Sequence, residues 1–217
     1  MKHILITALL ALLGTGALAQ TSQGTVTLSG GLSISSSSSG TDENNKNREI
    51  SFSITPKVGY FIADNLELGI SSTYRAAKFN TNLPGYKSVT KEHSQAIGTY
   101  LKKYFMLGDK VAVHATANLN YVTTRQKASS TTFQDIGSQT SETFSDLDYF
   151  GLNFSPGITF FPTEKIGLGA SFGNVGYGYR TESNRSESDS SKSNSSNIGL
   201  DLSTSSLVFS FNYYLNR

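Results

Sequence analysis

Hydrophobic and polar residues alternate with a period of two along most of this chain. The clearest example runs from Ile50 to Ile62, where large apolar residues occupy every second position and Ser, Thr, Lys or Gly stand between them. Such alternation puts apolar side chains on one face of a β-strand and polar side chains on the other. Eight segments follow this rule, near residues 25–34, 50–62, 66–71, 94–105, 111–121, 152–160, 166–179 and 198–215. The pattern predicts an all-β fold of about eight antiparallel strands.

Three of these segments depart from simple alternation. Near residues 94–105 apolar side chains occupy both phases, and Lys102 and Lys103 put a charge on each face, so the pattern does not assign the faces of that strand. In the last two segments the apolar positions change phase partway along. A β-bulge inserts one residue and so reverses the phase. We therefore expect bulges near residues 173–176 and 203–206.

The connections between the segments alternate strictly between short and long. The short ones are 63–65, 107–109 and 162–164, which contain Asp, Asn, Gly or Pro and predict tight turns. The long ones are 35–46, 76–92, 126–142 and 181–196, and they are rich in Ser, Asn, Thr, Lys and Glu. This composition is typical of solvated, mobile loops. The alternation predicts an up-and-down topology with turns at one end and loops at the other.

Aromatic residues gather near the ends of the predicted strands. One set consists of the pairs Tyr60-Phe61, Tyr104-Phe105, Phe160-Phe161 and Tyr213-Tyr214, and a second set consists of Tyr74, Tyr121, Tyr149, Tyr177 and Tyr179. Strands can cross hydrocarbon only as a closed barrel with an apolar outer face. Aromatic girdles, short periplasmic turns and long extracellular loops accompany that architecture. The sequence therefore predicts an antiparallel transmembrane β-barrel.

Alternation alone also fits a soluble, lipocalin-type barrel, which would bury its large residues and show the polar set to water. The polar set here is mostly Ser, Gly, Thr and Asn, with few charges. Such residues suit a narrow lumen better than a solvent-facing surface. This favours the membrane barrel.

The N-terminus has the features of a secretory signal peptide. Lys2 precedes an apolar run from Ile4 to Leu13, and the small-residue site 17–19 precedes Gln20. We expect a signal peptide over residues 1–19 and a barrel domain over residues 20–217. The chain has no cysteine, which excludes disulfides, thiolate metal sites and an N-terminal lipid anchor.

Charge gives no indication of a nucleic-acid partner. The chain has 18 basic and 16 acidic residues, and removal of Lys2 would leave 17 against 16. This balance provides no basic stripe of the kind that nucleic-acid binding needs.

Together these features resemble the small outer-membrane β-barrels of Gram-negative bacteria, in particular the eight-stranded barrels of the outer-membrane protein A and X types and their Bacteroidota versions. The resemblance covers residues 24–217, and its motifs are the turn segments 59–69 and 160–169 and the closing strand 209–214. It implies an outer-membrane location, contact with outer-membrane lipid and lipopolysaccharide, and insertion by the barrel-assembly machinery. Relatives commonly end on an aromatic residue, whereas this chain ends with Leu215, Asn216 and Arg217.

Catalytic chemistry is not indicated. His93 lies in a predicted loop, and His114 lies on the inward face with Thr116, near a short turn. Outer-membrane lipid hydrolases need a Ser-His-acid site that faces lipid near the outer leaflet, so this arrangement does not fit. No cluster has metal-ligand spacing and no glycine series fits a phosphate cradle. We expect no enzyme, and no catalytic, cofactor or metal residues.

The remaining functional expectations concern the lumen and the loops. Lys57, Glu67 and either Lys102 or Lys103 are expected in the lumen, where a polar cluster could plug the barrel or line a wet passage. The first hypothesis is a monomeric structural or surface-interaction protein whose four loops contact an extracellular ligand. The alternative is a narrow pore for water or small solutes. A soluble lipocalin-like carrier and a lipid hydrolase are the weaker alternatives.

Overall fold

The structure, a computed structural model, describes residues 21–42, 45–134, 137–186, 190–201 and 208–215. The predicted signal peptide lies outside these residues. The described residues form one antiparallel sheet whose strands are β1 (Val26–Asp42), β2 (Asn45–Ala63), β3 (Leu66–Leu83), β4 (Tyr86–Met106), β5 (Val111–Gln134), β6 (Gly137–Thr163), β7 (Ile166–Ser171), β8 (Asn174–Ser186), β9 (Ser190–Asp201) and β10 (Val208–Leu215). No helix in this part of the chain is long and apolar enough to cross a membrane.

The strand pairings close a ring at the end of the short turns. Each strand from β1 to β6 pairs with the next, β6 pairs with β7, β7 with β10, and β10 with β1. The three short connections are turns at residues 64–65, 107–110 and 164–165, which confirms the predicted turn positions. Closure at this end satisfies the backbone hydrogen bonds that a hydrocarbon environment cannot satisfy.

The sheet has ten strands, which differs from the expected number of about eight. The difference arises because each of the last two predicted strands is split into two. β7 and β8 both pair with β6, β10 pairs with β7, and β9 pairs with β8. Between the paired positions Phe154–Val175 and Gly157–Ser171, residues 155–156 of β6 face the longer stretch 172–174. This one-residue excess is a β-bulge, beside the predicted position. The second predicted bulge, near residues 203–206, lies outside the described residues.

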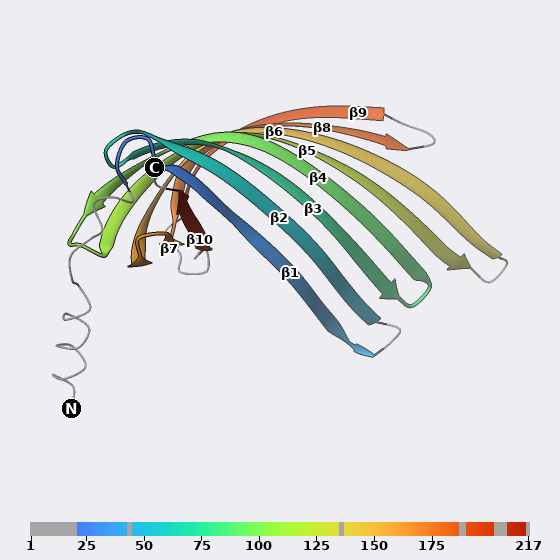
Figure 1. Cartoon of the computed structure of the whole chain (residues 1–217). Coiled ribbons are helices and arrows are strands. Elements are labelled where there is room, and N and C mark those ends of the chain that lie inside the picture. Colours follow the sequence, from blue (N-terminus) through green and yellow to red (C-terminus); the bar gives the residue numbers. More distant parts are fainter. Residues whose placement is uncertain (1–20, 43–44, 135–136, 187–189, 202–207, 216–217) are drawn as a thin grey trace.

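In the described residues, the four segments predicted to be long loops form mainly strands instead. They extend as hairpin arms β1–β2, β3–β4, β5–β6 and β8–β9, and Figure 1 shows these strands running together away from the short-turn end. Strands of 24 and 27 residues, β5 and β6, far exceed the roughly ten residues that cross a bilayer. Ser and Thr are compatible with strands when cross-strand partners are present. Their polar composition correctly indicated exposure but did not indicate irregular structure.

The two faces of the sheet match the membrane arrangement and not the lipocalin arrangement. Large apolar residues point outward and are exposed, including Leu32 at 67% and Ile70 at 66%, whereas Thr27 and Thr159 face inward and are buried. The undecided strand is now assigned: Ile97 points outward with Leu101 and Phe105, and Tyr100, Lys102 and Tyr104 point inward.

The ring is less complete toward the arms. β1 pairs with β10 only from Val26 to Gly30, and within the described residues its remaining length pairs with β2 alone. β9 pairs only with β8 among the described strands. Figure 1 shows β1 and β9 at opposite margins of the long curved sheet. The described strands therefore leave the barrel open on one side above Gly30.

Candidate functional site

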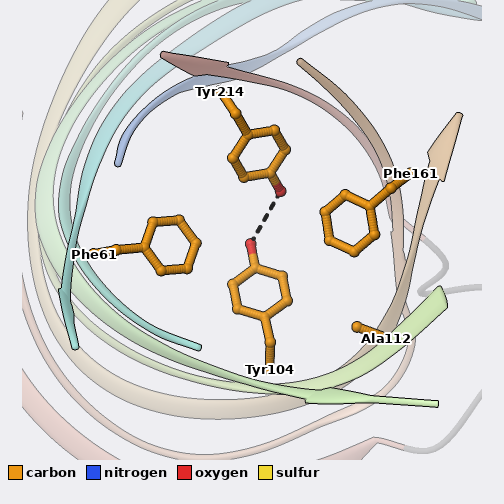
Figure 2. Packing of buried hydrophobic residues seen from close by; sticks show 5 residues of the cluster. All are labelled: Phe61, Tyr104, Ala112, Phe161 and Tyr214. Atoms are coloured by element: carbon orange, nitrogen blue, oxygen red, sulfur yellow. Dashed lines mark hydrogen bonds between the residues drawn. The ribbon is translucent and has the colours of Figure 1, made fainter. Parts of the chain in front are cut away.

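Four aromatic side chains fill the barrel at its short-turn end. Phe61, Tyr104, Phe161 and Tyr214 come from β2, β4, β6 and β10, and each is at most 1% exposed. Figure 2 shows the four rings pointing toward one another inside the ring of strands, with Ala112 beside them. Neighbouring ring centroids lie 5.7–6.4 Å apart, within the range of favourable aromatic pairs. We call this cluster the aromatic plug.

Each of these four residues belongs to one of the adjacent aromatic pairs noted in the sequence. The pairs were predicted to form a girdle, but a strand sends neighbouring side chains to opposite faces. Tyr60, Phe105 and Phe160 point outward, with exposed fractions of 40–53%, while their partners point inward. Only half of each pair can therefore contact lipid. The period of two would have been enough to predict the plug.

A buried carboxylate lies directly above the plug. Glu67 is 2% exposed, and it accepts hydrogen bonds from the hydroxyls of Tyr100 at 2.6 Å and Tyr104 at 2.9 Å. A buried carboxyl group needs such partners, because an unpaired buried polar group is costly. Room for this network comes from Gly59 and Gly69, where an added Cβ would collide with Glu67 and Tyr100 respectively.

Two lysines share the lumen with Glu67. Lys102 is buried on the strand next to Glu67 and its Nζ lies 4.6 Å from the centre of the Tyr104 ring, while Lys57 Nζ lies 6.0 Å from that of Tyr100. Lys103 points outward and is exposed. The prediction that Lys57, Glu67 and one of the two adjacent lysines face the lumen is therefore confirmed, with Lys102 as the inward one. The cluster adjoins the plug through Tyr104.

His114 faces inward near the short turns, as predicted. It is 4% exposed, its ring lies 5.8 Å from that of Tyr104, and Thr116 Oγ1 lies 3.4 Å from its Nδ1. Gly157 on the paired strand leaves the space that this ring fills. This is a packed position in the wall of the lumen and not a lipid-facing one. The described residues contain no group of three metal-ligating side chains.

Two cavities lie above the plug. The lower one, of about 740 Å³, is lined by Lys57, Glu67, Tyr100, Lys102 and His114. The upper one, of about 610 Å³, lies between the arms and has Arg75, Glu92, Arg180 and Glu182 in its wall. Arg75 lies 3.6 Å from Glu92, and Arg180 lies 2.9 Å from Glu182. The lumen is thus polar, hollow above and closed below.

The lower cavity also reaches the side on which the described strands leave the barrel open. Its wall includes Gly31 and Leu32 from β1, where β10 no longer pairs, and Phe209 from β10. A molecule in this cavity would therefore contact both the polar lumen and the lipid-facing margin of the sheet.

The second aromatic set is largely on the outer surface. Tyr74, Tyr121, Tyr177 and Tyr179 are 41–45% exposed. Tyr149 was predicted to join them, but it lies on the lumen side, where an added Cβ at Gly151 or Gly178 would meet its ring. Its neighbour Phe150 takes the outward position and is 43% exposed. The outer girdle thus includes Phe150 in place of Tyr149.

Known proteins with a detectable likeness to this chain include two solved structures. Among solved structures, the chain is similar to the ferric yersiniabactin uptake receptor FyuA from Yersinia pestis, with 13% identity and a TM-score of 0.39 over 74% of this chain and 26% of that one. It is also similar to the CymD monoaromatic hydrocarbon channel, with 11% identity and a TM-score of 0.32 over 92% and 90% of the two chains. No curated protein matches it. The family model for the outer membrane protein beta-barrel domain matches residues 5–214, so the chain belongs to this outer-membrane β-barrel family.

Proposed function

We propose that the protein is a monomeric, non-enzymatic outer-membrane barrel that anchors four hairpin arms outside the cell and does not conduct through its base. The observation that carries this proposal is the aromatic plug, because four buried rings and the Glu67 network occupy the lumen at the short-turn end. The closed ring at the base consists of β1 to β7 and β10, and a barrel of eight strands has an interior that side chains can fill. The arms, paired along their length, provide a firm polar surface for contact with an extracellular ligand.

The plug can be tested by single-channel conductance in planar bilayers. The wild-type protein is expected to be silent, and the double variant Phe61→Ala with Tyr104→Ala is expected to show discrete openings. The matched control replaces the outward partners, Tyr60→Ala with Phe105→Ala, and it should stay silent. Steady openings of the wild-type protein would contradict the proposal.

The outward direction of the arms can be tested by cysteine labelling, because the chain contains no cysteine. A membrane-impermeant maleimide added to intact cells should label Ser129→Cys on the β5 arm. It should not label Asp109→Cys at a short turn until the outer membrane is opened. The reverse labelling pattern would show that the arms face the periplasm and the short turns face the outside of the cell.

Insertion would use the barrel-assembly machinery, and the outward apolar face would contact outer-membrane lipid. Extraction of the outer-membrane fraction followed by gel electrophoresis with and without boiling tests the folded barrel, since closed barrels resist detergent until heated. A heat-dependent shift of a monomer-sized band is expected. Recovery in the soluble periplasmic extract would contradict the membrane location.

A second candidate is passage of small solutes, which the 740 Å³ cavity favours because it reaches the open side of the barrel at Gly31. In this case a solute would leave sideways into the bilayer and not through the plug. An added Cβ at Gly31 or at Gly199 meets nothing within 4 Å. Transfer of a small amphipathic dye from water into proteoliposomes should then be slowed by Gly31→Trp and not by Gly199→Trp.

A further inference from the structure

Basic residues form the first charged positions above the lipid-facing band on four neighbouring strands. Moving along the outward face away from the short turns, the residue after Ile50 on β2 is Arg48, and the residue after Ala76 on β3 is Lys78. On the outward faces of β4 and β5 the first charged residues beyond the apolar run are Lys91 and Arg125, and all four basic side chains are exposed. The inward face of the same region differs, because there Arg75 meets Glu49 and Glu92. On β2 to β5 the outward face therefore carries only basic charges in this region, and the acidic residues Glu142, Asp146 and Asp148 stand on the neighbouring strand β6.

The strand register brings three of the lysines together. Lys78 is the cross-strand partner of Lys91, and Lys91 is the partner of Lys127. Like charges directly opposite one another destabilise a sheet. Lys127 has Glu142 at 2.8 Å, but no ion pair among the described residues includes Lys78 or Lys91. An external anion would remove this repulsion.

Several basic side chains line one depression on the outer surface. It has a volume of about 430 Å³, and its wall includes Lys91, Arg125, Lys127, Arg185 and Asp146. The carboxylate of Asp146 already accepts a hydrogen bond from Arg185 at 2.6 Å. Within this wall four cations face one carboxylate. We call this depression the basic groove.

An apolar depression lies on the same outer face, nearer the short turns. It has a volume of about 600 Å³ and is lined mainly by apolar residues, which include Val58, Ile70, Ile97, Leu119, Tyr121 and Phe150. Both depressions draw on β4, β5 and β6. Tyr121 precedes Arg125 by four residues on β5, which corresponds to roughly 13 Å of strand. Tyr at the outer girdle marks the headgroup level, so the basic groove lies just outside it.

From this arrangement we propose that β2 to β6 bind a phosphorylated glycolipid of the outer leaflet, with its acyl chains in the apolar depression and its phosphates in the basic groove. Lys and Arg bind phosphate through charge-assisted hydrogen bonds. A membrane lipid fits better than a free anion, because only a lipid would use both depressions. This inference goes beyond the proposed function and does not depend on whether the lumen conducts.

The test measures binding of phosphorylated lipid A to the purified full-length barrel in detergent. Replacement of three cations, Lys78→Gln with Lys91→Gln and Arg125→Gln, is expected to weaken binding by at least about tenfold, since exposed charge contacts are individually modest and add up. The matched control, Lys103→Gln with Lys110→Gln and Lys165→Gln, removes the same charge at the short-turn end and should leave binding unchanged. Dephosphorylated lipid A should bind the wild-type protein as weakly as the triple variant binds lipid A.

Two results would overturn the inference. Equal weakening by both triple variants would show that only net charge matters. Displacement of lipid A by inorganic phosphate at a similar concentration would show a site for a free anion and not for a lipid. A heat-dependent gel shift in both variants establishes that they fold, and all six substituted positions belong to the surface of the sheet or its turns.

Discussion

The hydroxyl groups of Tyr104 and Tyr214 lie 3.4 Å apart inside the barrel, although 110 residues separate them in the chain. β4 and β10 are not neighbours in the sheet, so this contact crosses the lumen. It forms only because the strand ring closes at the short-turn end. The same closure brings Phe61 and Phe161 against both tyrosines.

Substitution of Tyr104 separates hydrogen bonding from ring packing. Tyr104→Phe keeps the ring but removes the donor to Glu67, and it should cost about 1–3 kcal/mol of unfolding free energy. Tyr104→Ala also leaves a void and should cost about 3–5 kcal/mol. Urea unfolding in lipid vesicles measures both. No cost for Tyr104→Phe would mean that the hydrogen bond to Glu67 contributes nothing, and equal costs for the two variants would mean that ring packing contributes nothing.

Loss of the Glu67 carboxylate should destabilise the barrel base. Glu67→Leu removes the acceptor for two tyrosine hydroxyls and leaves the buried Lys102 without the nearby negative charge. A buried hydroxyl that loses its acceptor typically costs about 1–3 kcal/mol. The temperature of the heat-dependent gel shift should fall. Glu49→Leu, on an exposed arm, is the control and should change it little.

Gly69 is required because the Tyr100 ring occupies the place of its Cβ. Gly69→Ala should displace that ring and weaken its hydrogen bond to Glu67, so the folded yield should fall. Gly199→Ala is the matched control, since an added Cβ there meets nothing within 4 Å. The fraction of heat-shifting protein in outer membranes measures the effect. Similar losses at both positions would point to general strand flexibility.

Neighbouring residues on one strand should tolerate charge very differently. Ile54 points outward and is 45% exposed, whereas Thr55 faces the lumen and lines both cavities. Ile54→Lys would put an ammonium in hydrocarbon and should cost about 2–4 kcal/mol near the bilayer midplane. Thr55→Lys should cost much less. Urea unfolding in vesicles compares them, and a larger cost at Thr55 would reverse the assigned faces.

The arms should be protected from hydrogen exchange if they are strands. Residues 87–91 and 127–131 pair along β4 and β5 in unbroken register, so their amides are expected to exchange slowly. Mobile loops would exchange within the shortest labelling time. Hydrogen exchange with mass spectrometry on the detergent-solubilised barrel distinguishes the two, with the short turn at 107–110 as the rapidly exchanging reference.

The sequence by itself determined the alternating strand segments, the faces of most of them and the short turns, because these depend on local rules. A period of two sets which side chains share a face, and turn residues such as Asp64 and Asn65 mark where the chain reverses. Asn65 does adopt the left-handed conformation, with φ of 62°. The same period of two also implies that one member of each adjacent aromatic pair points inward.

Only the tertiary structure decided the phase of β4, the pairing of the arms and the position of the plug. Tyr100 and Tyr104 point inward because Glu67 and Gly69 on β3 provide an acceptor and space for them. Ser- and Thr-rich segments become strands because each arm finds a partner in register, a relation that composition does not reveal. The basic groove likewise depends on which residues of different strands stand opposite one another. Cross-strand register is a non-local property, and ring closure fixes it.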